Sequence, residues 1–251
     1  MNILKTHTLT TNQADTFLVY WANSSVRPGG VIKVRVTAKM QDAHIAAELA
    51  AMQHLLEEKC VIGSNLVGNA NTQLVVSLGA IKKLRRCQSD KSHLAPYANF
   101  LTTRFAGCPI SVDKDTRWFD GFMPDTEEDL LVSGPKRETL KVTGLGNVAV
   151  TQHVLNRFAD RFLPESCPDK LAQTAWKKLK DVAADPTVRE VTRQGLWAAV
   201  KYAHQGKQQG RYFLNGRSNL VLVITDNPGE GKRLVTAYPA TRQFCALPMA
   251  A

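Results

Sequence analysis

The stretch RYFLNGRSNLVLVIT, residues 211–225, is typical of a β-hairpin. Two runs rich in apolar and β-branched residues, RYFL and LVLVIT, are joined by a segment that opens with Asn215-Gly216, a strong turn dipeptide. After a loop with proline and glycines, residues 234–238 form a third run of the same kind. The pattern predicts an antiparallel β-meander near the end of the chain.

Helical patterns precede this meander. Residues 151–162 repeat apolar side chains at helical spacing, and a second helix is expected to begin at Ser166-Cys167-Pro168. A third helical pattern covers residues 187–203, and residues 140–142 form a short predicted strand before all three. Helices followed by an antiparallel sheet predict an α+β domain.

The first part of the chain mixes strands with helices. Residues 16–22 are β-branched and aromatic, and residues 31–40 alternate apolar with basic side chains, so both are predicted strands joined through Pro28-Gly29-Gly30. Helical spacing follows Asp42, the expected N-cap, up to about Lys59. Further helices are expected at residues 72–86 and 91–105, and short strands at 65–67 and 110–112. This order of strands and helices resembles that of a ribonuclease-H-like fold, which implies an α/β domain with helices packed on a mixed sheet.

An acidic segment with proline and glycine, residues 120–139, is predicted to link two domains, 1–119 and 140–251. The whole chain has 32 Lys and Arg against 22 Asp and Glu, a net charge of +10. Residues 1–140 hold 16 basic and 14 acidic side chains, whereas residues 141–251 hold 16 and 8. The basic second domain therefore suggests a polyanionic partner, and we expect a nucleic acid rather than a membrane.

The sequence indicates neither a metal centre nor a membrane segment. Its five cysteines are widely spaced without a CxxC pair, so neither a zinc site nor a disulfide framework is predicted. The N-terminus lacks the apolar run of a signal peptide, and the longest uncharged run, residues 60–81, contains several polar side chains. We expect a cytoplasmic protein without a cofactor.

The first helix of the second domain carries side chains suited to RNA cleavage without a metal. That reaction needs a base for the ribose 2′-OH, an acid for the leaving oxygen and cations for the phosphorane charge. His153 and Arg157 are four residues apart and share a helix face. We predict them as catalytic residues together with Tyr212, Thr236 and Tyr238 of the meander. The alternatives are a helix cap or surface residue for His153, a surface cation for Arg157, and ordinary strand positions for the other three.

Other cations of the second domain are candidates for binding the RNA backbone. They are Arg161, Lys177, Lys178, Lys180 and Arg211. The three lysines equally fit a solvated helix face.

The second domain resembles the small toxin-nuclease fold of RelE-type, barnase-like, EndoU-like and colicin-type ribonucleases. The resemblance covers residues 150–240 and is carried by TQHVLNRF at 151–158 with Arg161-Phe162, by GRYF at 210–213 and by LVTAYP at 234–239. It implies helices packed on an antiparallel sheet and a catalytic face formed by the first helix and the late strands. It also favours RNA over DNA as the partner.

The first domain resembles a ribonuclease-H-like fold. AELAA at 47–51 is similar to the first helix of that family, and NANTQ at 69–73 stands where the family has an acidic turn before a helix. The family holds two divalent metals with a cluster of carboxylates, and Glu48 matches one of them. The place of a second acid is held by Asn69 or Asn71, and neutral amides cannot balance the charge of two Mg²⁺ ions. The resemblance therefore implies a degenerate metal site at Glu48, Asn69 and Asn71.

These observations support functions of two different classes. The leading hypothesis is a metal-independent ribonuclease of toxin or defence type, which would have RNA and an antidote or other protein as partners. The alternative is a non-catalytic nucleic-acid-binding or regulatory protein built from two degenerate nuclease folds. A weaker third option keeps the first domain active through Glu48, Asp113 and Asp115 with Mg²⁺.

Overall fold

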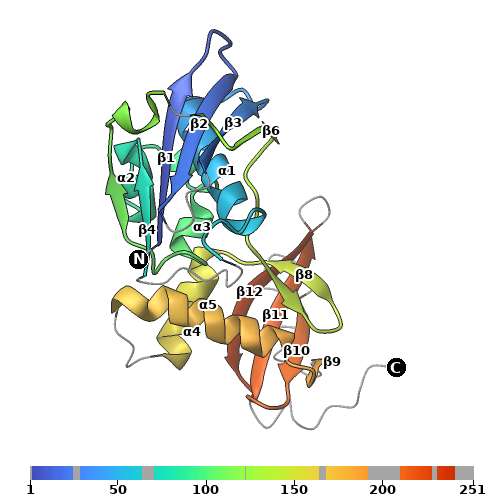
Figure 1. Ribbon diagram of the computed structural model, residues 1–251. Coiled ribbons are helices and arrows are strands. Elements are labelled where there is room, and N and C mark those ends of the chain that lie inside the picture. Colours follow the sequence, from blue (N-terminus) through green and yellow to red (C-terminus); the bar gives the residue numbers. More distant parts are fainter. Residues whose placement is uncertain are drawn as a thin grey trace. The chain divides into compact units, whose positions relative to one another are not determined.

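The computed structural model describes residues 2–24, 29–63, 71–121, 123–163, 168–191, 210–227 and 231–240 (Figure 1). The chain divides into two compact units, Met1–Lys136 and Arg137–Ala251. Each unit is built on a six-stranded sheet, and the described residues include five α-helices. None of the described helices is long and apolar enough to cross a membrane.

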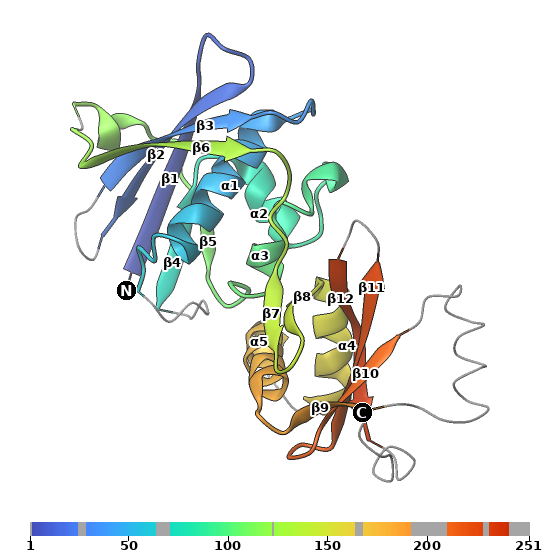
Figure 2. The same cartoon turned by 90° about the vertical axis from the view of Figure 1, so that its right-hand side faces the viewer.

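The first unit contains a mixed sheet with the strand order β5-β4-β1-β2-β3-β6. β1, β2 and β3 are antiparallel neighbours, whereas β4 is parallel to β1, β5 to β4 and β6 to β3. Parallel pairs require crossover connections, which the helices between these strands provide (Figure 2). The strands are β1 (Asn2–Thr10), β2 (Thr16–Asn23), β3 (Gly29–Val36), β4 (Thr72–Val76), β5 (Ile110–Val112) and β6 (Thr126–Val132).

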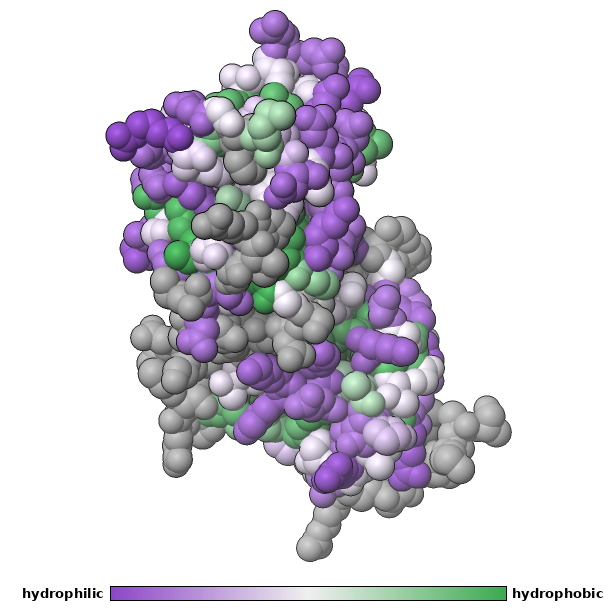
Figure 3. Space-filling view, viewed as in Figure 1, coloured by the Kyte–Doolittle hydropathy of each residue, from purple (hydrophilic) through white to green (hydrophobic). Residues whose placement is uncertain are grey.

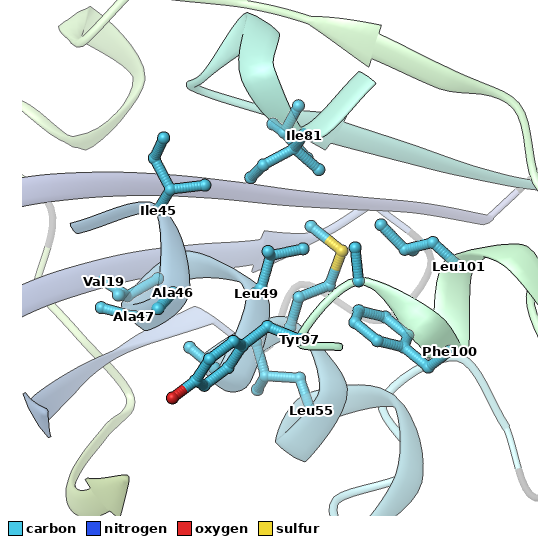
Figure 4. Packing of buried hydrophobic residues seen from close by; sticks show 14 of the residues in the cluster. Val19, Ile45, Ala46, Ala47, Leu49, Leu55, Ile81, Tyr97, Phe100 and Leu101 are labelled. Atoms are coloured by element: carbon cyan, nitrogen blue, oxygen red, sulfur yellow. The ribbon is translucent and has the colours of Figure 1, made fainter. Parts of the chain in front are cut away.

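The core of the first unit lies between the sheet and helix α1 (Ala43–Glu57). α1 contacts β1, β2 and β3, and its residues Leu49 and Leu55 are completely buried. Figure 4 shows these side chains together with Val19 of β2 and with Phe100 of the short helix α3 (Asn99–Thr102). Removal of this apolar surface from water is the main favourable contribution to the stability of the unit.

Several local predictions for the first unit are confirmed. Strands occur where residues 16–22 and 110–112 predicted them, and a helix follows Asp42. The side chain of Asp42, however, does not cap α1. Its carboxylate instead accepts a hydrogen bond from Nζ of Lys91 at 2.7 Å and makes none to the backbone N–H groups at the start of the helix. The strand predicted at residues 65–67 lies outside the described residues.

The helix predicted at residues 72–86 is wrong in its first half. Thr72–Val76 forms β4, in which Leu74 and Val76 are completely buried, and only α2 (Gly79–Arg85) is helical. A short apolar run is compatible with the residue spacing of a helix and with that of a strand. Pairing with β1 on one side and β5 on the other favours the strand. The helix predicted at residues 91–105 is limited to a 3₁₀ turn, η1 (Ser92–Leu94), and the single turn α3.

Residues 120–139 are more than the linker that the composition suggests. Thr126–Val132 forms β6, an edge strand of the first sheet that runs parallel to β3. Lys33 of β3 is in register with Asp129 of β6, so the acidic run lies beside basic side chains. Charged residues are common on edge strands because they discourage pairing with other chains. The acidic segment therefore belongs largely to the first unit.

The second unit contains a sheet with the order β7-β8-β12-β11-β10-β9. All neighbouring strands are antiparallel except β8 and β12. The meander predicted at the end of the chain is confirmed as the last three strands. The strands are β7 (Thr139–Val142), β8 (Gly146–Ala149), β9 (Val188–Val191), β10 (Arg211–Asn215), β11 (Leu220–Asn227) and β12 (Gly231–Pro239).

Two helices, α4 (Gln152–Phe162) and α5 (Pro168–Ala184), pack on one face of this sheet, as predicted for an α+β domain. α4 packs along β12 and against α5 (Figure 2). The Asn215 side chain at the end of β10 donates from Nδ2 to the carbonyl of Val182 in α5 at 2.8 Å. Phe158 of α4 and Trp176 of α5 are buried. This packing holds α4 on the face of the sheet along β12.

The helix predicted at residues 187–203 is wrong where the structure describes it. Val188–Val191 forms β9, which is antiparallel to β10. Val188 and Val191 are buried, and β-branched residues favour a strand in such a position. The rest of that predicted helix, residues 192–203, lies outside the described residues.

Candidate functional site

A pocket of about 270 Å³ opens in the second unit beside the first half of α4. Its lining residues come from α4, its N-cap and the strands β11 and β12: Thr151, His153, Val154, Arg157, Thr225, Arg233, Leu234 and Val235. The structure therefore brings His153 and Arg157 into one cavity. The other predicted catalytic residues, Tyr212, Thr236 and Tyr238, do not belong to this lining.

The sequence of α4 explains why it presents His153 and Arg157 to the pocket. Thr151 is the N-cap, and its hydroxyl accepts a hydrogen bond from the backbone N–H of Val154. Val154 and Phe158 are buried on the apolar side of the helix, whereas His153 and Arg157 are exposed. The spacing of four residues places the imidazole and the guanidinium on the same side of the helix.

Thr225 and Arg233 reach the pocket as directly opposite residues of β11 and β12. The next pair is Ile224 with Leu234, and beyond it the register shifts because β12 contains one extra residue, Val235. A β-bulge of this kind changes the direction of neighbouring side chains. Neither residue was predicted from the sequence. Counting outward from the loop at 228–230 would have paired Thr225 with Arg233, but the bulge has no comparable signal.

The pocket is basic. Its lining includes Arg157 and Arg233 and no Asp or Glu residue. Within the described part of the chain, neither guanidinium has a hydrogen-bond or ion-pair partner. Unpaired guanidinium groups recognise phosphate oxygens well, and imidazole is the side chain that most readily exchanges a proton near neutral pH. The arrangement is suited to binding an anion and transferring protons to it.

Arg161, predicted to bind the RNA backbone, attaches α4 to β12. Its Nη1 donates hydrogen bonds to Oγ1 of Thr236 at 2.8 Å and to the carbonyl oxygen of Ala237 at 2.6 Å. The Thr236 side chain is almost completely buried. This contact holds the bulged part of β12 against the helix that carries His153 and Arg157.

Tyr212 and Tyr238 lie beside a small buried cluster formed by Val191, Leu214 and Val221. Tyr212 is opposite Val191 in the strand register, and Tyr238 is opposite Val221. Packing against this cluster gives both rings a structural role. A catalytic role for their hydroxyl groups stays a prediction.

The remaining predicted RNA-binding cations differ in their surroundings. Lys177, Lys178 and Lys180 are exposed on α5, where Figure 3 shows a hydrophilic surface. Arg211 instead forms a bidentate pair with Glu190, from Nε to Oε1 at 2.7 Å and from Nη2 to Oε2 at 2.6 Å. The hydrogen bonds from this guanidinium lower the pKa of Glu190. A guanidinium already paired in this way is a weaker phosphate ligand than an unpaired one.

In the first unit, Glu48 of α1 is completely buried and hydrogen-bonded on both oxygens. Its Oε1 accepts from the Thr6 hydroxyl at 2.9 Å and from the backbone N–H of Ser77 at 2.8 Å. Its Oε2 accepts from the Ser77 hydroxyl at 2.6 Å. Burial raises the pKa of Glu48, and the hydrogen bonds from Ser77 and Thr6 oppose that shift. The carboxylate is thus bound by protein donors on β1 and just after β4.

The other residues proposed for a metal site in the first unit do not gather around Glu48. Asn71 is exposed at the start of β4, whereas the residue that reaches Glu48 is Ser77, beyond the opposite end of that strand. Asn69 lies outside the described residues. The carboxylate of Asp113 pairs with Lys5 and that of Asp115 with Arg117, at 2.8 Å in each case. In the part of the chain that the structure describes, no three His, Cys, Asp or Glu side chains are grouped as metal ligands.

Comparison of the chain with protein-family models, with curated proteins and with solved structures finds no match.

Proposed function

We propose that the second unit is a metal-independent ribonuclease of toxin or defence type. His153 exchanges protons with the reacting oxygens of the RNA, and Arg157 stabilises the negative charge that grows on the phosphorane. The observation that carries the proposal is that both side chains line one basic pocket without an acidic residue. Attack of the ribose 2′-OH on the adjacent phosphorus would release the 5′-oxygen and leave a 2′,3′-cyclic phosphate.

Two further observations support this proposal. Helices packed on a mostly antiparallel sheet are the arrangement that the resemblance to small toxin nucleases implies. The excess of basic residues between 141 and 251 favours a polyanionic substrate.

For the first unit we propose a ribonuclease-H-like scaffold that has lost its catalytic metal site. Its mixed sheet with helices in the crossovers supports the resemblance. The enclosure of Glu48 by Thr6 and Ser77 supports the loss of metal binding, because the carboxylate oxygens are already hydrogen-bonded inside the core. This unit would select the RNA target or bind a protein partner such as an antidote.

The proposal is tested by incubating the purified full-length protein with total RNA, with and without EDTA, and mapping the product ends. We expect cleavage to continue in EDTA and to produce 2′,3′-cyclic phosphates. The double variant His153→Ala with Arg157→Ala should lose this cleavage. The control is Arg189→Gln, which also removes one positive charge from an exposed position of the second unit. Cleavage that is unchanged in the double variant contradicts the assignment.

One observation favours the alternative of a non-catalytic RNA-binding protein. The imidazole of His153 has no hydrogen-bond partner in the described residues that would orient it or fix its tautomer. This alternative predicts salt-dependent RNA binding without cleavage products under any of these conditions.

A further inference from the structure

We infer that Arg157 and Arg233 together form a clamp for one phosphate group of a nucleic-acid backbone. Arg233 was not a candidate on sequence grounds, and the pocket geometry alone identifies it. The inference deepens the proposed function and rests on it for the assignment of RNA as the substrate.

The two arginines line the pocket from different elements. Arg157 comes from α4, and Arg233 comes from β12, where it is opposite Thr225 on one side and Ala149 of β8 on the other. Ala149 is followed almost directly by Thr151, the N-cap of α4. This short connection and the contact of Arg161 with Thr236 fix the strand and the helix relative to one another. The backbone positions from which both arginines extend are therefore held in place.

The neighbouring cations show why the clamp is specific to these two side chains. Lys232 precedes Arg233, but its Nζ donates to the carbonyl oxygen of Leu145 at 2.8 Å. Arg161 binds Thr236 and Ala237, and Arg211 binds Glu190. Arg157 and Arg233 instead keep their donors available within the described structure. Each guanidinium group offers several N–H donors and can bind two phosphate oxygens at once, which makes two such groups at one pocket suited to a phosphate.

The size of the pocket limits what it can accept. A volume of about 270 Å³ lies at the lower end for small-molecule sites, which usually begin near 300 Å³. A phosphate with part of its ribose fits such a space. The inferred ligand is therefore a single backbone phosphate.

The clamp is tested by titrating the full-length protein with inorganic phosphate and then with uridine 3′-monophosphate, using calorimetry at constant ionic strength. We expect Arg233→Gln to weaken the binding of both probes about tenfold, because it removes a charge-assisted bidentate contact. Arg233→Lys should recover only part of the affinity, since an ammonium group cannot bind two oxygens in the fork geometry of a guanidinium. Arg189→Gln is the control and should bind as the wild type does.

A second measurement uses only the wild-type protein, so it tests the clamp even if the variants fail to fold. Arginines of the wild-type protein are modified with phenylglyoxal, with and without phosphate, and the sites are mapped by mass spectrometry. Protection of Arg157 and Arg233 but not of Arg189 supports the clamp, and equal modification in both conditions overturns it.

The failure of this inference can be distinguished from the failure of the proposed function. If the wild-type protein cleaves RNA and Arg233→Gln binds both probes normally, the clamp is wrong and the ribonuclease assignment stands. If Arg233→Gln loses phosphate binding but the wild-type protein never cleaves RNA, the clamp stands and the catalytic role of His153 is wrong.

Discussion

Glu48 in the first unit and Arg157 in the second are both charged residues of helices, but their surroundings are opposite. Glu48 is buried and accepts hydrogen bonds from Thr6 and Ser77. Arg157 is exposed beside a pocket that offers it no acidic partner. A charge whose hydrogen bonds are completed by the protein contributes to the fold, whereas an uncompensated charge at a cavity is available to a ligand. The contrast assigns a structural role to one site and a binding role to the other.

The largest effect is expected on RNA cleavage when His153, which lines the pocket, is replaced. His153→Ala should reduce RNA cleavage at least about a hundredfold, which is the usual contribution of a general acid or base. The free energy of unfolding should change little, because the side chain is exposed. Cleavage rates and urea unfolding curves measure the two quantities. The exposed His93 of the first unit, changed to Ala, is the control, and an equal loss of activity in that variant would contradict the role of His153.

The second prediction concerns Glu48 and is expected to affect stability rather than cleavage. Glu48→Leu leaves the hydroxyl groups of Thr6 and Ser77 and one backbone N–H without an acceptor, which should lower the free energy of unfolding by about 3 kcal/mol. Glu48→Gln keeps an acceptor oxygen and should cost less. Both variants should cleave RNA at the wild-type rate where they are folded. A loss of cleavage in a fully folded Glu48→Gln protein would instead indicate a catalytic carboxylate.

The pH dependence of stability gives a further test of the same residue. Burial raises the pKa of Glu48 above its ordinary value of 4.5, so the folded protein holds this proton more tightly than the unfolded chain. Wild-type stability should therefore fall as the pH rises from about 4.5 through the raised pKa. Glu48→Gln lacks this titration, and the difference between the two unfolding free energies should change in that interval.

The same comparison shows what the sequence could and could not reveal. The spacing of His153 and Arg157 on an amphipathic helix was sufficient to place both in one site, because helical geometry is local. The partners of Glu48 could not be found in this way. Thr6 lies on a strand that was not anticipated, and Ser77 follows a strand that resembled a helix. Which strands flank β4 depends on the topology of the whole sheet, and that information is not local.

Arg233 and Thr225 illustrate an intermediate case. Their pairing follows from the loop between β11 and β12, so a correct hairpin register predicts it. The extra residue Val235 then shifts the register, and Thr236, which follows it, contacts Arg161 and does not line the pocket. The sequence therefore predicted the strand β12 correctly. It also predicted Thr236 at the catalytic face, whereas the structure places this side chain against Arg161.

A smaller effect is expected from the contact between α4 and β12. Arg161→Ala removes the donor to Thr236 and to the carbonyl of Ala237, and we expect a loss of about 1 kcal/mol in the free energy of unfolding. RNA cleavage should decrease as well, because the walls of the pocket are no longer fixed to one another. Thr236→Val tests the same contact from the strand and should reproduce the direction of both changes. Wild-type cleavage and stability in both variants would show that this contact does not position the site.

The smallest expected effect compares a paired cation with an unpaired one within the second unit. Each phosphate contact contributes about 0.7 to the slope of log affinity against log salt concentration for single-stranded nucleic acid. Arg157→Gln should reduce that slope by about this amount, because its guanidinium has no partner among the described residues. Arg211→Gln should reduce it by less, because Glu190 already binds this guanidinium through two hydrogen bonds. Equal slopes for the two variants, measured by RNA binding between low and physiological salt, would mean that ion pairing within the protein does not determine which cations contact the RNA.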